Sequence, residues 1–174
     1  VWYVIPMAIT QSVMPSIVAA RKAQNGSYEH RLVLLIAMLF WGSVTVAVLV
    51  TLFGPWMITK LFGPDYSSAG RILQVHFWAG VFVSVGVAIG QWFLAENRLK
   101  LPMYRTIAGA ITNITLNMVL IPAIGIFGAA LATVVSQFIQ VYLSTAWFGE
   151  SKPAWRLINR GVLYPLVLLN RQAK

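Results

Sequence analysis

The residues most able to do chemistry in this sequence are polar groups placed inside long apolar runs. Five residues in the run from 72 to 95 recur at intervals of four, four, three and four: His76, Gly80, Ser84, Val87 and Gln91. Such spacing puts them on one face of a helix. Polar groups are costly inside a membrane, so this face either lines a hydrated cavity or packs through small residues and hydrogen bonds. His76 and Gln91 are predicted cavity residues, while Gly86 and Gly90 form a GxxxG packing pattern on another face.

Two later runs carry polar faces of the same kind. The first contains Thr106, Gly109, Asn113 and Asn117, and the second contains Thr133, Gln137, Gln140 and Ser144. An amide in lipid needs a partner, so both faces are expected to point into a helix bundle. Asn113 and Gln137 fit either a cavity wall or helix packing. Gln137 lies deeper in its run than Gln140, which favours Gln137 for the cavity.

Basic and proline residues near the ends of runs add further candidates. Arg71 precedes His76 by about one turn and could contact a pyrophosphate or an anionic headgroup, or extend its charge to the interface. Arg98, Lys100 and Arg105 fit a role in membrane orientation, or contact with a phosphate at the mouth of a cavity. Pro15 frees a backbone carbonyl in the first run, which predicts a hinge or an ordinary kink.

Enzyme chemistry finds no support in the sequence. The four acidic residues, Glu29, Asp65, Glu96 and Glu150, lie in loops and far apart, and there is no cysteine. No carboxylate pair, metal-ligand cluster, phosphate-binding glycine loop or nucleophile elbow is present. We therefore predict no catalytic residue, no metal and no cofactor.

The elements that must hold these residues are membrane-spanning helices. Of the 174 residues, 59% are apolar and 10% are charged, whereas soluble domains have about 25% charged residues. Five runs are long enough to cross a bilayer and lack the alternation of β-strands: 1–20, 32–53, 72–95, 101–121 and 124–148. The run 161–169 is too short to cross. The predicted fold is an all-α polytopic transmembrane bundle of about five spanning helices plus a truncated sixth.

Charge in the loops predicts the orientation of the bundle. Nine basic residues fall in or beside the loops 21–31, 96–100 and 149–160, against two, Lys60 and Arg71, on the other side. The positive-inside rule places the nine in the cytoplasm. The net charge of +9 then suits anionic lipid rather than nucleic acid.

Two short connections show turn chemistry. Gly63-Pro64-Asp65 predicts a tight turn on the outer side, within a loop from 54 to 70. In the connection from 122 to 128, Pro122 is predicted to end the fourth helix, and Gly125 and Gly128 permit a sharp reversal. Helices joined this briefly are antiparallel neighbours.

The run from Asn113 to Gln137, NITLNMVLIPAIGIFGAALATVVSQ, resembles a late helical hairpin of the polysaccharide exporters. These are the O-antigen flippases of the multidrug/oligosaccharidyl-lipid/polysaccharide transporter superfamily. The segment Leu61 to Tyr66 before the third span and the segment Val13 to Ile17 are similar to the same family. The resemblance covers about residues 1 to 150.

The resemblance implies a two-lobed transporter of the bacterial inner membrane that works by alternating access. It would move a polyprenyl-pyrophosphate-linked oligosaccharide between leaflets, as in O-antigen and lipopolysaccharide synthesis. Residues 1–174 would form most of the C-terminal lobe, and the N-terminal lobe would be missing. Coupling to a proton or sodium gradient would make His76 the obvious titrating group.

Three other functions remain open at this point. A drug or cation antiporter of the same superfamily would favour an acidic cavity, and the five runs contain no acidic residue. A membrane-embedded polymerase or ligase of the polysaccharide pathway would favour a large outer loop with clustered charged residues. A structural membrane subunit would have dry, tightly packed inner faces.

Overall fold

The computed structural model describes residues 3–23 and 26–166, and in those ranges it contains helices and no strand. The helices are α1 (Val4–Ala23), α2 (Ser27–Phe62), α3 (Ser67–Ala95), α4 (Lys100–Ile124), α5 (Ile126–Phe138), α6 (Ser144–Trp147) and α7 (Lys152–Val162). Short turns join some of them: 3-10 turns at Pro64–Tyr66 and Gly149–Ser151, and a π-turn at Ile139–Leu143. Five helical segments are long and apolar enough to span a membrane, which confirms the predicted all-α membrane bundle.

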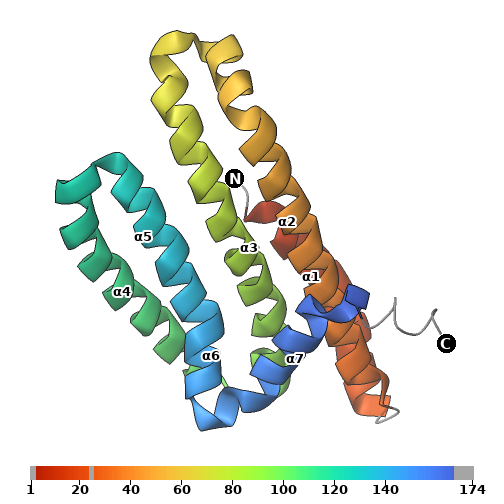
Figure 1. Cartoon of the computed structure of the whole chain (residues 1–174). Coiled ribbons are helices and arrows are strands. Elements are labelled where there is room, and N and C mark those ends of the chain that lie inside the picture. The colour runs from red at the N-terminus through yellow and green to blue at the C-terminus, as the bar shows by residue number, and fades with distance from the viewer. Residues whose placement is uncertain (1–2, 24–25, 167–174) are drawn as a thin grey trace.

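Two helical hairpins, α2–α3 and α4–α5, form the frame of the molecule and diverge from a common base (Figure 1). Helix α1 lies behind α2 and α3, and α7 crosses the base toward α2. The largest apolar cluster joins α2, α3 and α7 and includes Leu35, Ile36, Phe93 and Ile158. This core fixes the base, while the outer parts of the two hairpins stay apart.

The outer connection between the second and third spans differs from the predicted loop at 54–70. Helix α2 continues to Phe62 with Pro55 inside it, and α3 begins at Ser67. At 1.5 Å per residue the 36 residues of α2 rise roughly 54 Å, well beyond a hydrocarbon core of about 30 Å. The reversal itself occurs at Gly63, with φ 96°, followed by the Pro64–Tyr66 turn, so the tight turn was predicted correctly and its long flanks were not.

Pro122 was also expected to end the fourth helix, and this prediction is wrong. Helix α4 runs through Pro122 to Ile124. Membrane-spanning helices tolerate proline because neighbouring helices and local adjustments satisfy the backbone groups that it frees. The helix ends where Gly125 adopts φ 64°, and the Gly125 N–H donates to the Ile121 carbonyl at 2.8 Å. A positive φ of this kind is the reason for glycine there.

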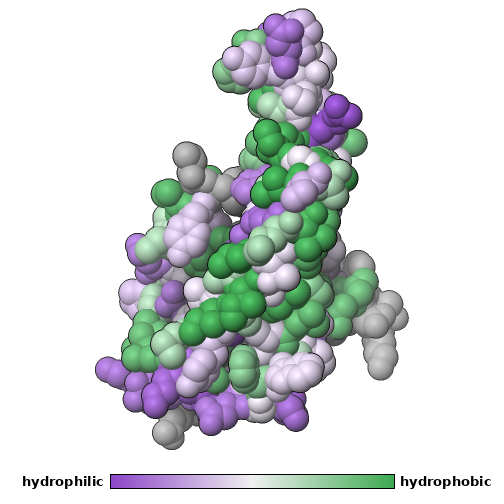
Figure 2. Space-filling view, turned by 90° about the vertical axis from the view of Figure 1, so that its left-hand side faces the viewer, coloured by the Kyte–Doolittle hydropathy of each residue, from purple (hydrophilic) through white to green (hydrophobic). Residues whose placement is uncertain are grey.

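The surface carries an apolar band between two polar ends. In Figure 2, hydrophilic side chains gather at the base and at the tip of the long hairpin, and the region between is mostly hydrophobic. Exposed large apolar residues of α4, among them Ile107, Ile111, Ile114 and Met118, belong to this band. The band is what a bilayer requires of a spanning bundle.

One buried hydrogen bond between the two long helices offers a measure of their packing. Ser43 Oγ of α2 donates to Ser84 Oγ of α3 at 2.7 Å, and Ser84 Oγ donates to the Gly80 carbonyl. We expect a double-mutant cycle of Ser43→Ala and Ser84→Ala, measured by thermal unfolding in detergent, to give a coupling of roughly 0.6–1.7 kcal/mol, as for other interhelical hydrogen bonds in membranes. Strict additivity of the two substitutions would contradict this contact.

Candidate substrate cavity

A cavity of about 540 Å³ opens between α1, α3, α4 and the α5 segment with its π-turn. Its polar lining comes from Thr10, Gln11, Gln91, Arg105, Thr106, Gln137 and Gln140. Gly86 and Gly90 line the α3 wall. A Cβ on Gly86 would lie 3.0 Å from Val141 Cγ2, whereas one on Gly90 would meet nothing within 4 Å. Gly86 therefore serves close packing, and Gly90 leaves the cavity wall open.

Two neighbouring hollows extend this cavity along the bundle. One, of about 330 Å³ between α3 and α5, is lined by His76, Gly80 and Thr133, and shares Val83 and Gln137 with the main cavity. The other, of about 780 Å³ beside α1, contains Lys22 and shares Gln11 and Gln91. The shared residues make the three hollows neighbours along the bundle. No residue lining any of them is acidic.

Arg105 is the most unusual residue of the main cavity. It is 5% exposed, its Nε donates to the Gln140 carbonyl at 3.0 Å, and its guanidinium lies 5.0 Å from the centre of the Phe93 ring. In the part of the chain that the structure describes, no carboxylate pairs with it. A buried cation without a counter-charge is costly, so its presence beside a cavity indicates a site for an anion.

The π-turn positions the partner of Arg105. The Gln140 carbonyl accepts from Arg105 Nε and from Ser144 Oγ. Helix α4 approaches this turn at Gly109, where an added Cβ would lie 2.5 Å from Gln140 Oε1 and 2.8 Å from Gln140 Cβ. π-Turns are frequent at functional sites because they re-aim backbone groups. Here the turn holds a carbonyl where it can orient the arginine.

Thr10 supplies a second polar group of note. It lines the cavity from α1 and is 0% exposed, and its Oγ1 has no hydrogen-bond partner among residues 3–23 and 26–166. Buried hydroxyls are normally satisfied, because an unpaired one costs about 1–3 kcal/mol. An unpaired hydroxyl in the same cavity as Arg105 is consistent with a polar ligand.

The structure brings together three of the five predicted cavity residues. Gln91 and Gln137 line the main cavity, and His76 lines the adjoining hollow that also contains Gln137. The predicted polar face of α3 is divided, however. Ser84 points toward α2, where it pairs with Ser43, while Gly80, Val87 and Gln91 line the hollows.

Asn113 and Arg71 lie outside the hollows described here. Asn113 Nδ2 donates to Ser136 Oγ at 3.2 Å, and Asn113 Oδ1 accepts from Asn117 Nδ2 at 2.9 Å. The first bond joins α4 to α5 and the second lies within α4, so Asn113 takes part in helix packing. Arg71 is exposed near the start of α3, on the protruding hairpin. Substrate contact at Asn113 and Arg71 stays a prediction.

Pro15 lies on an unbroken helix. Helix α1 runs from Val4 to Ala23 with Pro15 inside it, and Pro15 lines the hollow beside α1. The structure shows a continuous helix at Pro15. A hinge motion there stays a prediction.

The sequence did not predict that Arg105 is buried in the cavity, because it lies five residues after Lys100, close to the predicted interface. Its position in the second turn of α4 resembles that of any orienting cation. One signal was present: Gly109 follows one turn later on the same face, so that face can accept a close neighbour. Which neighbour approaches depends on the fold, and the sequence pattern does not contain that information.

A cavity that is open to water can be tested by cysteine labelling. The sequence contains no cysteine, so the wild-type chain gives no background labelling. We expect Gln91→Cys and Gln137→Cys to react with a membrane-impermeant methanethiosulfonate on the order of tenfold faster than Ile114→Cys, because thiolates form in water and not in lipid. Ile114 is a fair control because it is 61% exposed on the apolar band. Equal, slow labelling at all three positions would indicate a dry, packed interior and would favour the structural-subunit alternative.

Together, the spanning helices define a multi-pass membrane protein with a polar cavity between its helices. The chain belongs to the lipid II flippase MurJ family, whose model matches residues 3–167. This family lies within the same flippase superfamily that the sequence resemblance indicated, and its members are transporters rather than enzymes. The flippase class of the resemblance is thus confirmed, and its O-antigen specificity stays a prediction.

Two archaeal proteins are similar to this chain. A probable low-salt glycan biosynthesis flippase, Agl15, of Haloferax volcanii is 28% identical over 127 residues, covering 66% of this chain and 27% of the relative. An uncharacterized membrane protein of Methanocaldococcus jannaschii is 34% identical over 118 residues, covering 66% of this chain and 22% of the relative. The chain therefore spans about a quarter of the length of these relatives. No solved structure matches it.

Proposed function

We propose that this chain forms most of the C-terminal lobe of a flippase that moves a polyprenyl-pyrophosphate-linked oligosaccharide across a membrane by alternating access. The observation that carries the proposal is Arg105, a buried cation on the wall of a polar cavity that pairs with no carboxylate of the described residues. A pyrophosphate supplies the counter-charge, and charge-assisted hydrogen bonds to phosphate oxygens are the strong ones. Family membership supports the same class of cargo.

The rest of the cavity suits the other parts of that cargo. Amide side chains such as Gln91 and Gln137 can donate to and accept from sugar hydroxyls. The exposed apolar band on α4 lies in the region where lipid would surround a polyprenyl tail. The N-terminal lobe predicted by the sequence resemblance would close the cavity from the opposite side.

The charge of the cavity separates this function from cation export. An antiporter for cationic drugs requires anionic groups to bind its cargo, and no acidic residue lines the three hollows. Arg105 would repel such a cargo. A gradient-coupled mechanism that uses His76 is part of the proposal, since His76 lines the hollow next to the main cavity.

We also propose that loops 21–31, 96–100 and 149–160 face the cytoplasm, on the charge asymmetry of the sequence. The membrane is proposed to be the plasma membrane. The bacterial inner membrane that the O-antigen resemblance implies is one case of it, and the relatives described above are archaeal.

Complementation of flippase-deficient cells tests this function. The chain, joined to its N-terminal lobe, is expected to restore surface glycan and to move the lipid-linked precursor to the outer leaflet. His76→Ala and Gln137→Ala should reduce this transfer at equal membrane abundance. Thr115→Ala is the matched control, because Thr115 is exposed on α4 and bonds only the Ile111 carbonyl. A correctly inserted wild-type protein that leaves the precursor inside, across several sugar pathways, would refute the proposal.

A further inference from the structure

Helix α7 has two faces of opposite character. Ala154, Leu157, Ile158 and Gly161 are buried on one side. Lys152, Arg156 and Arg160 recur every four residues on the other side and are exposed. We call these three residues the basic face of α7. A helix this amphipathic and this short lies along an interface rather than across a membrane.

The fold holds α7 rigidly in place. A Cβ on Gly161 would lie 2.5 Å from Ile36 Cγ2 and 3.3 Å from the Ala37 nitrogen, so α7 crosses α2 at close range. Trp41 Nε1 donates to the Val162 carbonyl at 3.2 Å, and Tyr142 Oη donates to Asn159 Oδ1 at 2.7 Å. The direction of the basic face is therefore set by packing.

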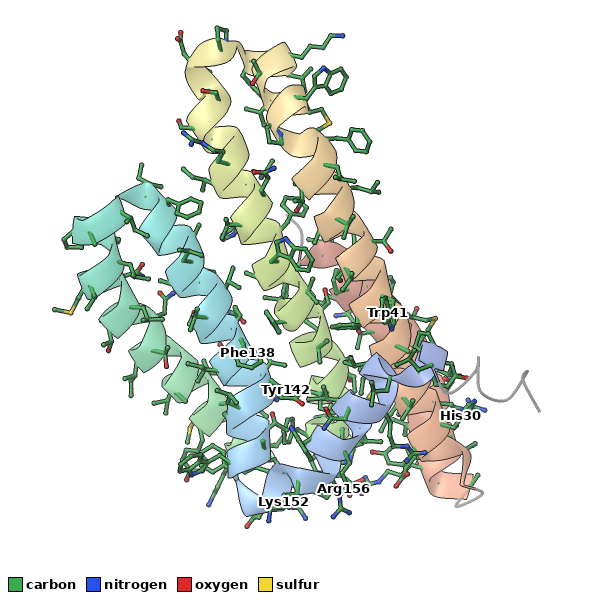
Figure 3. All side chains as sticks on the ribbon, viewed as in Figure 1. His30, Trp41, Phe138, Tyr142, Lys152 and Arg156 are labelled. Carbon is green, nitrogen blue, oxygen red and sulfur yellow. The ribbon has the colours of Figure 1, made fainter. Side chains whose placement is uncertain are left out.

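Two cations of this face have no carboxylate partner within residues 3–23 and 26–166. The ion pairs in those ranges are Arg21–Glu96, Arg98–Glu150 and Arg160–Glu29, at 3.3, 3.5 and 2.8 Å. They use all three acidic residues of this end, because Asp65 lies at the far tip. Lys152 and Arg156 remain uncompensated, and Figure 3 shows both at the base, directed away from the bundle.

The basic face is also separate from the substrate cavity. No residue of α7 lines the three hollows described above. An anion bound there would not be the cargo in transit. At the edge of a spanning bundle, the anionic groups at this level are phospholipid headgroups.

We propose that the basic face of α7 binds anionic phospholipid headgroups of the cytoplasmic leaflet through Lys152 and Arg156. This inference rests on the orientation given under the proposed function and not on transport itself. Each cation near an anionic surface contributes about fivefold to the preference for acidic lipid. Loss of both should lower that preference about 25-fold by the same reasoning.

Native mass spectrometry of the chain extracted from nanodiscs tests this site. Nanodiscs of phosphatidylcholine with a graded fraction of phosphatidylglycerol provide the lipids, and the bound lipids are counted. The wild type and the outer-end variant Lys60→Gln should retain phosphatidylglycerol. The pair Lys152→Gln/Arg156→Gln should lose it and retain phosphatidylcholine unchanged. Raising the salt concentration should displace phosphatidylglycerol from the wild type and not from the pair variant.

A second pair, Lys22→Gln/Lys100→Gln, neutralises two cations at the same end but outside α7 and should have the smaller effect. Equal retention by the α7 pair and the wild type would overturn the proposal, as would an equal loss in the second pair. Capture of a polyglutamate peptide by α7 without any lipid preference would also overturn it and would indicate a protein partner. All of these readouts are independent of flipping, so a failed transport assay would leave them interpretable.

Discussion

Replacement of Arg105 by glutamine is expected to reduce flipping of a pyrophosphate-linked oligosaccharide by roughly 100-fold, since removing one partner of a buried charge pair costs roughly 2–5 kcal/mol. The Arg105 side chain is 5% exposed and has no carboxylate partner in the described ranges. Its loss would leave the pyrophosphate in the cavity without a counter-charge. Proteoliposomes with a fluorescent lipid-linked oligosaccharide provide the measurement.

Arg105 also orients the π-turn through the Gln140 carbonyl, so the charge must be separated from the structural role. Arg105→Lys keeps the cation and loses the planar fork, and it should retain a measurable part of the activity that Arg105→Gln loses. Thermal unfolding should show both variants folded, with similar midpoints. If glutamine and lysine variants lose the same activity, or if glutamine leaves flipping unchanged, charge at this position does not act on the cargo.

Substitution of Gly128 by alanine is expected to have the largest effect on stability. An added Cβ would lie 2.4 Å from the Leu120 carbonyl oxygen and 2.6 Å from its carbon, and backbone atoms cannot move aside as a flexible side chain can. The α4–α5 hairpin would have to open. Overpacking of this kind costs roughly 3 kcal/mol, which corresponds to a fall of about 10 °C in the unfolding midpoint for a chain of this size.

Gly42→Ala is the matched control for this substitution. Gly42 is also helical, and an added Cβ there would meet nothing within 4 Å. Alanine should be neutral or slightly stabilising at that site, since it lowers the entropy of the unfolded chain. Equal midpoints for the two variants in a thermal scan would show that the hairpin is not packed as closely as described.

The spanning helices were predictable from the sequence because their signal is local. A run of about 20 apolar residues requires a helix in lipid, whatever surrounds it. Helix ends were less predictable. Pro55 and Pro122 both lie within helices, and only the positive φ of Gly63 and Gly125 ends α2 and α4. Whether a proline or the glycine that follows it ends the helix depends on packing at the hairpin tips.

The cavity was predictable only in part, since a polar helical face does not indicate whether it meets another helix or a cavity. Gln91 and Gln137 line the cavity and Asn113 bonds across the α4–α5 contact, yet all three are amides on polar faces of apolar runs. The burial of Arg105 was not predictable, for a different reason. Its position near a helix end resembled an interfacial cation, and its burial arises from Phe93 and Gln140, which are distant in the sequence.

The proposed function requires that the positively charged cavity accept a pyrophosphate-linked sugar lipid. The most direct measurement is a flipping assay in proteoliposomes that compares two cargoes, the polyprenyl-pyrophosphate oligosaccharide and the same oligosaccharide on an uncharged polyprenyl ether. The wild type should flip the first and not the second, and Arg105→Gln should remove that discrimination. Equal flipping of both cargoes by the wild type, or discrimination that survives the loss of Arg105, would contradict the claim.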